Sequence, residues 1–118
     1  MKLLYVEDHR AIAQVVSKAL RVAGHEVTLV HRVAEAQAVS QYHDVGIFDL
    51  GLPDGDGIEL CERLLRDGRI GAALFCSSSI DELLLERAAR TAPVIAKDAS
   101  LEELSRALST VCVKPNAS

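Results

Sequence analysis

Five residues with reactive or ion-binding side chains stand at the ends of short apolar runs in this sequence. They are three carboxylates, one hydroxyl and one ammonium: Glu7, Asp8, Asp49, Ser77 and Lys97. Glu7 and Asp8 directly follow the apolar residues 3–6, and adjacent anionic carboxylates repel each other. We therefore expect a cation to lie close to this acidic pair.

If these five side chains meet in the fold, they form a site for a divalent cation and a phosphoryl group. Three carboxylates favour a hard cation such as Mg²⁺, which completes its coordination shell with water and phosphate oxygens. One carboxylate can then act as a nucleophile toward phosphorus and form an acyl phosphate. Mg²⁺, the Lys97 ammonium and the Ser77 hydroxyl can each bind an oxygen of the transferred group.

The apolar pattern predicts five strands and five helices that alternate along the chain. Short continuous apolar runs are typical of parallel strands buried on both faces, whereas apolar residues repeated every three or four positions indicate helices. The predicted strands are 3–6, 27–30, 45–50, 72–76 and 93–96, and the predicted helices are 12–23, 33–41, 58–65, 81–90 and 101–111. A loop is expected over residues 51–57. In a parallel sheet of this kind, the five candidate residues all lie at one edge.

Two pairs of residues predict where the last two helices begin. Ser79 with Glu82 and Ser100 with Glu103 both have the spacing of a capping box, in which the serine and the acid each accept a backbone N–H at the start of a helix.

Length and composition limit the classes of protein to which the chain can belong. A chain of 118 residues with 49% hydrophobic and 25% charged residues suits one folded domain. A net charge of −4 with 3% aromatic residues argues against a nucleic-acid surface, and no apolar run is long enough to cross a membrane. We therefore expect a cytoplasmic protein that binds neither nucleic acid nor membrane. The three cysteines lie far apart and are expected to be inert buried thiols.

Four segments resemble the signature segments of the receiver domain of bacterial two-component response regulators. They are VEDH, VGIFDLGLPDGDG, ALFCSS and VIAKDAS, in this order, and the resemblance covers nearly the whole chain. It implies a flavodoxin-like (βα)5 fold, an α/β three-layer sandwich around a five-stranded parallel sheet. We expect residues 1–113 to form the receiver domain and residues 114–118 to be a C-terminal tail or linker remnant.

The resemblance implies a Mg²⁺ site around the acidic residues. Asp49 and Asp8 resemble residues that bind Mg²⁺ directly, and Glu7 resembles a neighbour that acts through a water molecule. The backbone carbonyl of Gly51 resembles the third protein ligand.

The resemblance also implies the chemistry of phosphorylation. Asp49 resembles the phosphoacceptor, Ser77 the hydroxyl that moves toward the phosphoryl group, and Lys97 the ammonium that pairs with its oxygens. The expected activity is limited to self-phosphorylation from a phosphodonor and slow self-dephosphorylation, so the chain is not expected to be an enzyme in the usual sense.

The resemblance further implies partners. A histidine kinase or a histidine phosphotransfer protein would supply the phosphoryl group, and a downstream protein or output domain would bind the face of the fourth helix, fifth strand and fifth helix. The fourth helix contains Leu83, Leu84 and Leu85 in a row. A helix cannot bury three consecutive positions against one sheet, so one of them is expected to be exposed.

Some positions depart from the family's pattern. Val94 stands where the family usually has an aromatic residue that rotates inward, and a valine has no ring to rotate. Asp98 follows Lys97 in place of a common proline. Ser78 and Ser79 are expected to lie at the entrance of the site, where they would influence access of water or of a phosphatase.

Two alternative functions remain open at this point. A degenerate receiver that binds a partner without phosphorylation is compatible with Val94, although the complete set of site residues argues against it. A phosphatase with an aspartate nucleophile needs a second acid two residues further on, where this chain has Gly51. A calcium-binding loop at residues 54–57 lacks the required later acids.

Overall fold

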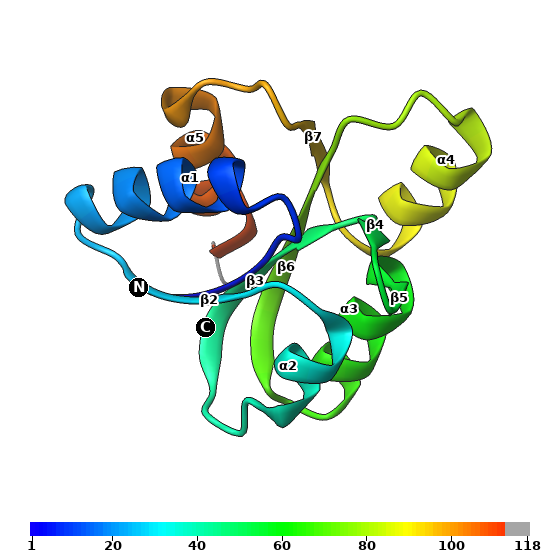
Figure 1. The fold of residues 1–118 in the computed structure, drawn as a ribbon, viewed down its shortest axis with the longest axis horizontal. Coiled ribbons are helices and arrows are strands. Elements are labelled where there is room, and N and C mark those ends of the chain that lie inside the picture. Colours follow the sequence, from blue (N-terminus) through cyan, green and yellow to red (C-terminus); the bar gives the residue numbers. More distant parts are fainter. Residues whose placement is uncertain (113–118) are drawn as a thin grey trace.

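The computed structural model describes residues 1–112 and shows five strands and five helices in alternation, with a small additional hairpin (Figure 1). The predicted tail, residues 114–118, lies outside the described residues. The elements are β1 (Lys2–Val6), α1 (Arg10–Val22), β2 (Glu26–Val30), α2 (Val33–Ala38), β3 (His43–Asp49), β4 (Gly51–Leu52), β5 (Gly55–Asp56), α3 (Gly57–Arg66), β6 (Ile70–Ser77), α4 (Glu82–Thr91), β7 (Val94–Ala96) and α5 (Leu101–Cys112).

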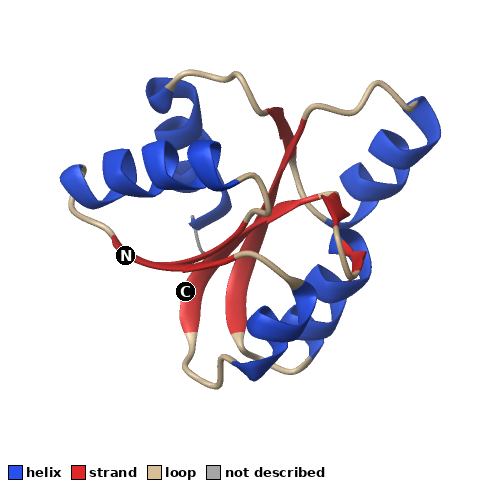
Figure 2. Cartoon of the chain, in the orientation of Figure 1, coloured by secondary structure: helices blue, strands red, loops and turns tan. Residues whose placement is uncertain are grey.

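The main sheet has five strands in the order β2-β1-β3-β6-β7, and every neighbouring pair is parallel. Its strands cross the middle of the molecule, and helices lie on both sides (Figure 2). This arrangement confirms the predicted three-layer α/β sandwich. The next two strands of the sheet along the chain, β2 and β3, lie on opposite sides of β1. The strand order therefore reverses between β1 and β3, and ligands bind at such a reversal in open α/β sheets.

Two apolar clusters form the core, one on each face of the sheet. Alternate residues of β1 point to opposite faces: Leu3 and Tyr5 pack with α1 and α5, and Leu4 and Val6 pack with α2, α3 and α4. All four side chains are buried, as the continuous apolar run predicts for a central parallel strand.

The start of α4 differs from the prediction. The proposed capping box of Ser79 and Glu82 is wrong, because Asp81 is the N-cap and its carboxylate accepts from the N–H groups of Leu83 and Leu84. Asp81 directly precedes the first helical residue, so its short side chain reaches these two amides. At α5 the prediction is confirmed: Ser100 accepts from the Glu103 amide at 3.1 Å, and Glu103 accepts from the Ser100 amide at 3.0 Å.

Two further expectations have clear outcomes. The predicted loop at residues 51–57 contains the two-stranded antiparallel hairpin of β4 and β5. Of the three consecutive leucines, Leu83 is 79% exposed, whereas Leu84 and Leu85 are partly buried against the core, as expected of a helix on a sheet.

The cysteines are distributed over both core clusters. Cys61 and Cys76 are buried, and burial raises the pKa of each thiol to about 12, which agrees with inert thiols. Cys112 is only half-buried, and its Sγ atom lies 3.3 Å from Sδ of Met1.

Among the helices of the described residues, none has the length and hydropathy needed to cross a membrane.

Candidate functional site

The site lies where β1, β3, β6 and β7 end, at one edge of the sheet. Backbone hydrogen bonds extend the strand pairing one residue further at both sides of this edge. Glu7 donates its amide to the carbonyl of Val30 at 3.0 Å, and Lys97 donates its amide to the carbonyl of Ser77 at 3.1 Å. The predicted residues are therefore held on backbone that is fixed by the sheet.

Lys97 lies between two carboxylates. Its Nζ atom is 2.9 Å from Oε2 of Glu7 and 3.2 Å from Oδ2 of Asp49. Glu7 is fully buried and Asp49 is 7% exposed. Oxygens of these two buried carboxylates lie within 4.8 Å of each other, so the carboxylates repel each other. The ammonium of Lys97 compensates part of that repulsion. The cation expected beside the acidic pair is therefore, in part, a residue of the chain itself.

Two histidines fix the backbone and side chain of Glu7. Oε2 of Glu7 accepts from the His9 amide at 3.1 Å, and the Glu7 carbonyl is 2.8 Å from Nδ1 of His31. Because a carbonyl only accepts, Nδ1 of His31 carries the proton. Sequence patterns did not predict the contact of His31 with Glu7. The signal that points to it is the position of His31 directly after β2, the neighbour of β1.

The electrostatics of the site leave Asp49 unusually basic. Burial, a hydrogen bond with Asp8 and the charge of Glu7 raise the pKa of Asp49 to about 6, against the opposing charge of Lys97. Burial alone would lower the pKa of Lys97, but its hydrogen bond to Glu7 and the charges of Asp49 and Glu7 outweigh that effect and raise it. The negative charge is thus only partly balanced by residues of the chain.

The three carboxylates fit a hard divalent cation. Glu7, Asp8 and Asp49 each offer an oxygen, and these atoms lie within 4.8 Å of one another. Oε1 of Glu7 is buried and, in the part of the chain that the structure describes, has no hydrogen-bond partner. An unpartnered buried carboxylate oxygen is costly. An all-oxygen donor set with one unsatisfied member suits Mg²⁺ or a similar ion with its bound water.

An open pocket of about 420 Å³ gives access to Asp49. It is lined by residues from every strand end of the site and from α4: Asp8, His9, Asp49, Leu50, Gly51, Ser77, Ser78, Ser79, Leu84 and Lys97. We call this pocket the acidic opening. It brings together all the predicted site residues except Glu7, which is buried beside it. Leu84 is a lining residue that sequence analysis did not predict, since its helical position indicated only core packing.

The backbone around Asp49 is closely packed. Gly57, the first residue of α3, approaches the Asp49 carbonyl so closely that a Cβ atom on Gly57 would lie 2.1 Å from that oxygen. Gly51 has no such neighbour within 4 Å and lines the acidic opening. The glycine that ends the motif DLGLPDGDG is therefore required by the path of the chain behind Asp49.

Ser77 lies at the rim of the acidic opening. The residue is 7% exposed, and its Oγ atom accepts a hydrogen bond from the Ser79 amide at 2.9 Å. The hydroxyl proton remains available for a second hydrogen bond, because a hydroxyl both donates and accepts.

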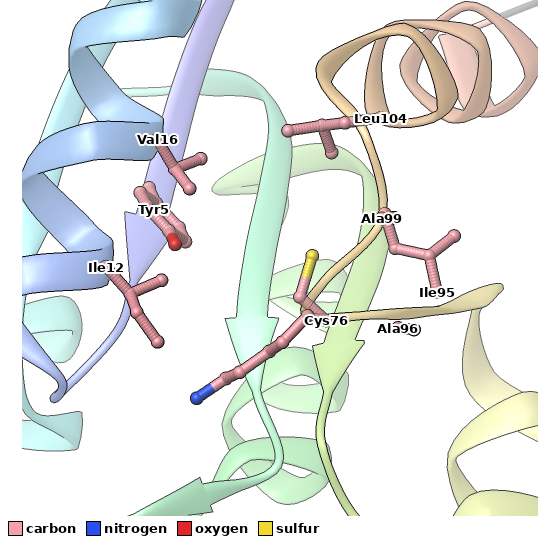
Figure 3. Close-up of a pocket in the computed structure, with 9 residues that line it drawn as sticks. Tyr5, Ile12, Val16, Cys76, Ile95, Ala96, Ala99 and Leu104 are labelled. Carbon is pink, nitrogen blue, oxygen red and sulfur yellow. The ribbon is translucent and has the colours of Figure 1, made fainter.

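A second, much smaller cavity of about 30 Å³ lies between α1 and α5, on the other side of Lys97. Tyr5, Ile12, Val16, Cys76 and Leu104 are among its lining residues, and their side chains surround the space in Figure 3. Burial raises the pKa of the Tyr5 hydroxyl, with a smaller effect of the charge of Glu7. Burial also raises the pKa of the Cys76 thiol, so both groups at this cavity favour their neutral forms.

Comparison with known proteins agrees with this geometry. Residues 3–109 match the family model described as the response regulator receiver domain. The chain is 30% identical over 119 residues to the DNA-binding transcriptional activator DevR/DosR of Mycobacterium tuberculosis, covering 94% of this chain and 54% of that protein. It is 37% identical over 65 residues to the virulence transcriptional regulatory protein PhoP of Salmonella typhimurium, covering 53% of this chain and 29% of PhoP.

Solved structures have the same fold. The BeF3-activated N-terminal receiver domain of Klebsiella pneumoniae RstA superposes with a TM-score of 0.85 at 22% identity, covering 97% of this chain and all of that one. The chain thus spans about half or less of the length of the curated relatives named above, and the full length of the RstA receiver domain. Because this family model matches residues 3–109, most of the chain, the chain belongs to the response regulator receiver domain family of two-component signalling.

Proposed function

We propose that this receiver domain is a Mg²⁺-dependent switch that is phosphorylated on Asp49. The observation that carries the proposal is the position of the Lys97 ammonium between Glu7 and Asp49, beside three carboxylates whose oxygens lie within 4.8 Å of one another. Such a site has a nucleophile, a fixed cation and room for a second cation in one pocket. The degenerate, phosphorylation-independent module is not favoured, because no part of this set is missing.

Glu7, Asp8, Asp49 and the Gly51 carbonyl are the groups that would hold Mg²⁺. When bound, Mg²⁺ would supply positive charge to the acidic residues and to the oxygens of the phosphoryl group. Asp8 is exposed and accessible to a hydrated ion, whereas Glu7 is buried with one unpartnered oxygen. This difference supports a direct role for Asp8 and a water-mediated role for Glu7.

The residues of the chain itself perform the transfer. A carboxylate oxygen of Asp49 attacks phosphorus, the new bond is P–O, and the bond from phosphorus to the nitrogen or oxygen of the donor breaks with its electron pair on the leaving group. With a pKa of about 6, Asp49 is mainly ionised near neutral pH and can act as the nucleophile. Lys97 and the Ser77 hydroxyl then bind the phosphoryl oxygens and stabilise the charge on them.

We propose a histidine kinase or a histidine phosphotransfer protein as the donor, in a cytoplasmic setting. The acidic opening is wide enough, at about 420 Å³, to admit a side chain of a partner. The downstream partner is proposed to bind the face of α4, β7 and α5. Exposed apolar residues on this side, Ile80 at 93% and Leu83 at 79% exposed, support that placement.

Intact-mass spectrometry tests the proposal. The protein is incubated with a small phosphodonor such as acetyl phosphate, with Mg²⁺ or with a chelator. The expected result is one phosphoryl adduct that needs Mg²⁺ and is absent in Asp49→Asn. Glu59→Gln, which removes an exposed acid on α3, is the control and should retain the adduct. A wild-type protein that binds Mg²⁺ but forms no adduct with any donor would favour the phosphorylation-independent module.

A further inference from the structure

A series of three short hydrogen-bonded turns connects Ser77 to the start of α4. The Ser79 amide donates to Oγ of Ser77 at 2.9 Å, and the Asp81 amide donates to Oγ of Ser79 at 3.1 Å. The Asp81 carboxylate in turn accepts from Leu83 at 3.1 Å and from Leu84 at 3.3 Å. Side chains of serine and aspartate thus replace regular secondary structure between β6 and α4.

Both ends of this series contact the functional site. Ser77 and Leu84 line the acidic opening together with Asp49. The hydroxyl of Ser77 is already an acceptor for the Ser79 amide, so a phosphoryl group on Asp49 can only use its proton. When Oγ of Ser77 moves toward that group, the Ser79 amide must follow or lose its hydrogen bond. Ser79 carries the next hydroxyl, and the displacement therefore reaches Asp81 and the first turn of α4.

Two other contacts connect α4 with segments near the site. Val94 of β7 is part of the same apolar cluster as Leu84 and Leu85, but its short branched side chain has no ring that could rotate inward. Arg87 of α4 lies 2.8 Å from Asp56, which is itself the N-cap of α3. That ion pair connects the middle of α4 to the segment after Asp49, whereas the serine turns connect the N-terminal end of α4 to Ser77.

We infer that Ser79 is a positioning residue whose hydroxyl couples phosphorylation of Asp49 to the first turn of α4. The coupling passes through the hydrogen bonds of Ser79 with Ser77 and with Asp81. This inference rests on the proposed function, and it assigns a role to a side chain that does not touch the phosphoryl group. The amides of Asp81, Leu83 and Leu84 are expected to respond to phosphorylation only while the hydroxyl of residue 79 is present.

The test compares Ser79→Ala with two matched variants. Ser79→Thr retains the hydroxyl, and Ser78→Ala removes a neighbouring hydroxyl that is exposed and is not part of the three turns. Each ¹⁵N-labelled protein is phosphorylated with acetyl phosphate and Mg²⁺, and intact mass gives the fraction of adduct. Amide chemical shifts and hydrogen exchange of residues 79–85 give the response of α4.

The wild type, Ser78→Ala and Ser79→Thr are expected to show shifted amides at Asp81, Leu83 and Leu84 on phosphorylation. Their hydrogen exchange should change by about fivefold, the effect of one hydrogen bond of this kind. At an equal fraction of adduct, as given by intact mass, Ser79→Ala should lose this response. If Ser79→Ala is phosphorylated and its α4 amides respond like those of the wild type, the inference is wrong. If the wild type forms no adduct, the proposed function itself fails, and the mass measurement separates this outcome from the first.

Discussion

Nζ of Lys97 lies 2.9 Å from Oε2 of Glu7, a carboxylate that is fully buried at the end of β1. Residues 90 positions apart in the chain thus form the central ion pair of the site. The pair also places the ammonium 3.2 Å from Oδ2 of Asp49, so one side chain balances two acids. Stability, metal binding and phosphorylation all depend on this balance of charge, and each can be measured separately.

Replacing Lys97 by methionine should destabilise the metal-free protein. The change leaves Glu7 and Asp49 buried without their counter-ion, and loss of one partner of a buried pair costs about 1–4 kcal/mol at such partly open sites. Urea denaturation in a chelator measures the loss, and excess Mg²⁺ should restore part of it. Equal free energies of unfolding for Lys97→Met and the wild type would show that the ion pair does not stabilise the fold.

Replacing Asp49 by asparagine should stabilise the metal-free protein near neutral pH. The pKa of Asp49 is raised from 3.8 to about 6 in the folded protein, so the folded state keeps a proton that the unfolded state has lost. The contribution of this carboxyl to the free energy of unfolding is therefore lost as the pH rises through that interval, and the loss is complete above it. Asparagine has no charge to bury, and we expect Asp49→Asn to be about 1–3 kcal/mol more stable than the wild type well above that interval.

The control for this prediction is the same comparison in acid. Below the unfolded-state pKa, Asp49 is protonated in both the folded and the unfolded protein, so the higher free energy of unfolding of Asp49→Asn should disappear. Thermal denaturation at several pH values measures the difference. An advantage that does not depend on pH would mean that packing of the amide, and not the charge of Asp49, is responsible.

Mg²⁺ should stabilise the wild type more than it stabilises Asp8→Asn. A ligand that binds only the folded state adds about 1–3 kcal/mol at 10 to 100 times its dissociation constant. Asp8 is exposed but interacts with Asp49, so the free energy of unfolding of each protein is first measured in a chelator, and the gain on adding Mg²⁺ is compared. Glu59→Gln removes an exposed charge on α3 and is the control that should retain the full effect of Mg²⁺. An unchanged Mg²⁺ effect in Asp8→Asn would exclude Asp8 as a ligand.

Gly57 and Gly51 should differ sharply in their tolerance of alanine. A Cβ atom at Gly57 would lie 2.1 Å from the backbone carbonyl of Asp49, whereas one at Gly51 has no neighbour within 4 Å. Forced backbone shifts of this kind cost about 1–3 kcal/mol or more, so Gly57→Ala should be clearly destabilised and Gly51→Ala close to the wild type. Urea denaturation compares the two. Similar stabilities would mean that the segment behind Asp49 adjusts without strain.

Sequence patterns predicted the fold well because buried parallel strands have an unambiguous signal. The continuous apolar run of residues 3–6 marks β1, and its four buried side chains alternate between the two core clusters. The predicted start of α4 was wrong because Ser79 and Asp81 are both good capping residues, and only the path of the chain decides which of them reaches the first amides. The β4–β5 hairpin has only two residues in each strand, too few to give a periodic pattern.

The candidate site was predicted in composition but not in detail. Parallel strands end at one edge of a sheet, so Asp8, Asp49, Ser77 and Lys97 were expected to meet, and all four line the acidic opening. The complete burial of Glu7 was not predicted, because it depends on contacts with distant segments of the chain. Its amide is bonded to Val30 and its carboxylate to Lys97, and neither contact has a local sequence signal.

The most direct test of the central claim is to locate the phosphoryl group. Borohydride reduces an aspartyl phosphate to homoserine, and tandem mass spectrometry of the digested protein then identifies the modified position. After incubation with acetyl phosphate, we predict homoserine at residue 49 alone, in the presence of Mg²⁺ and not with a chelator. Homoserine at Asp8, Asp54 or Asp56, or at no position under conditions where Mg²⁺ is bound, would contradict the assignment of Asp49 as the phosphoacceptor.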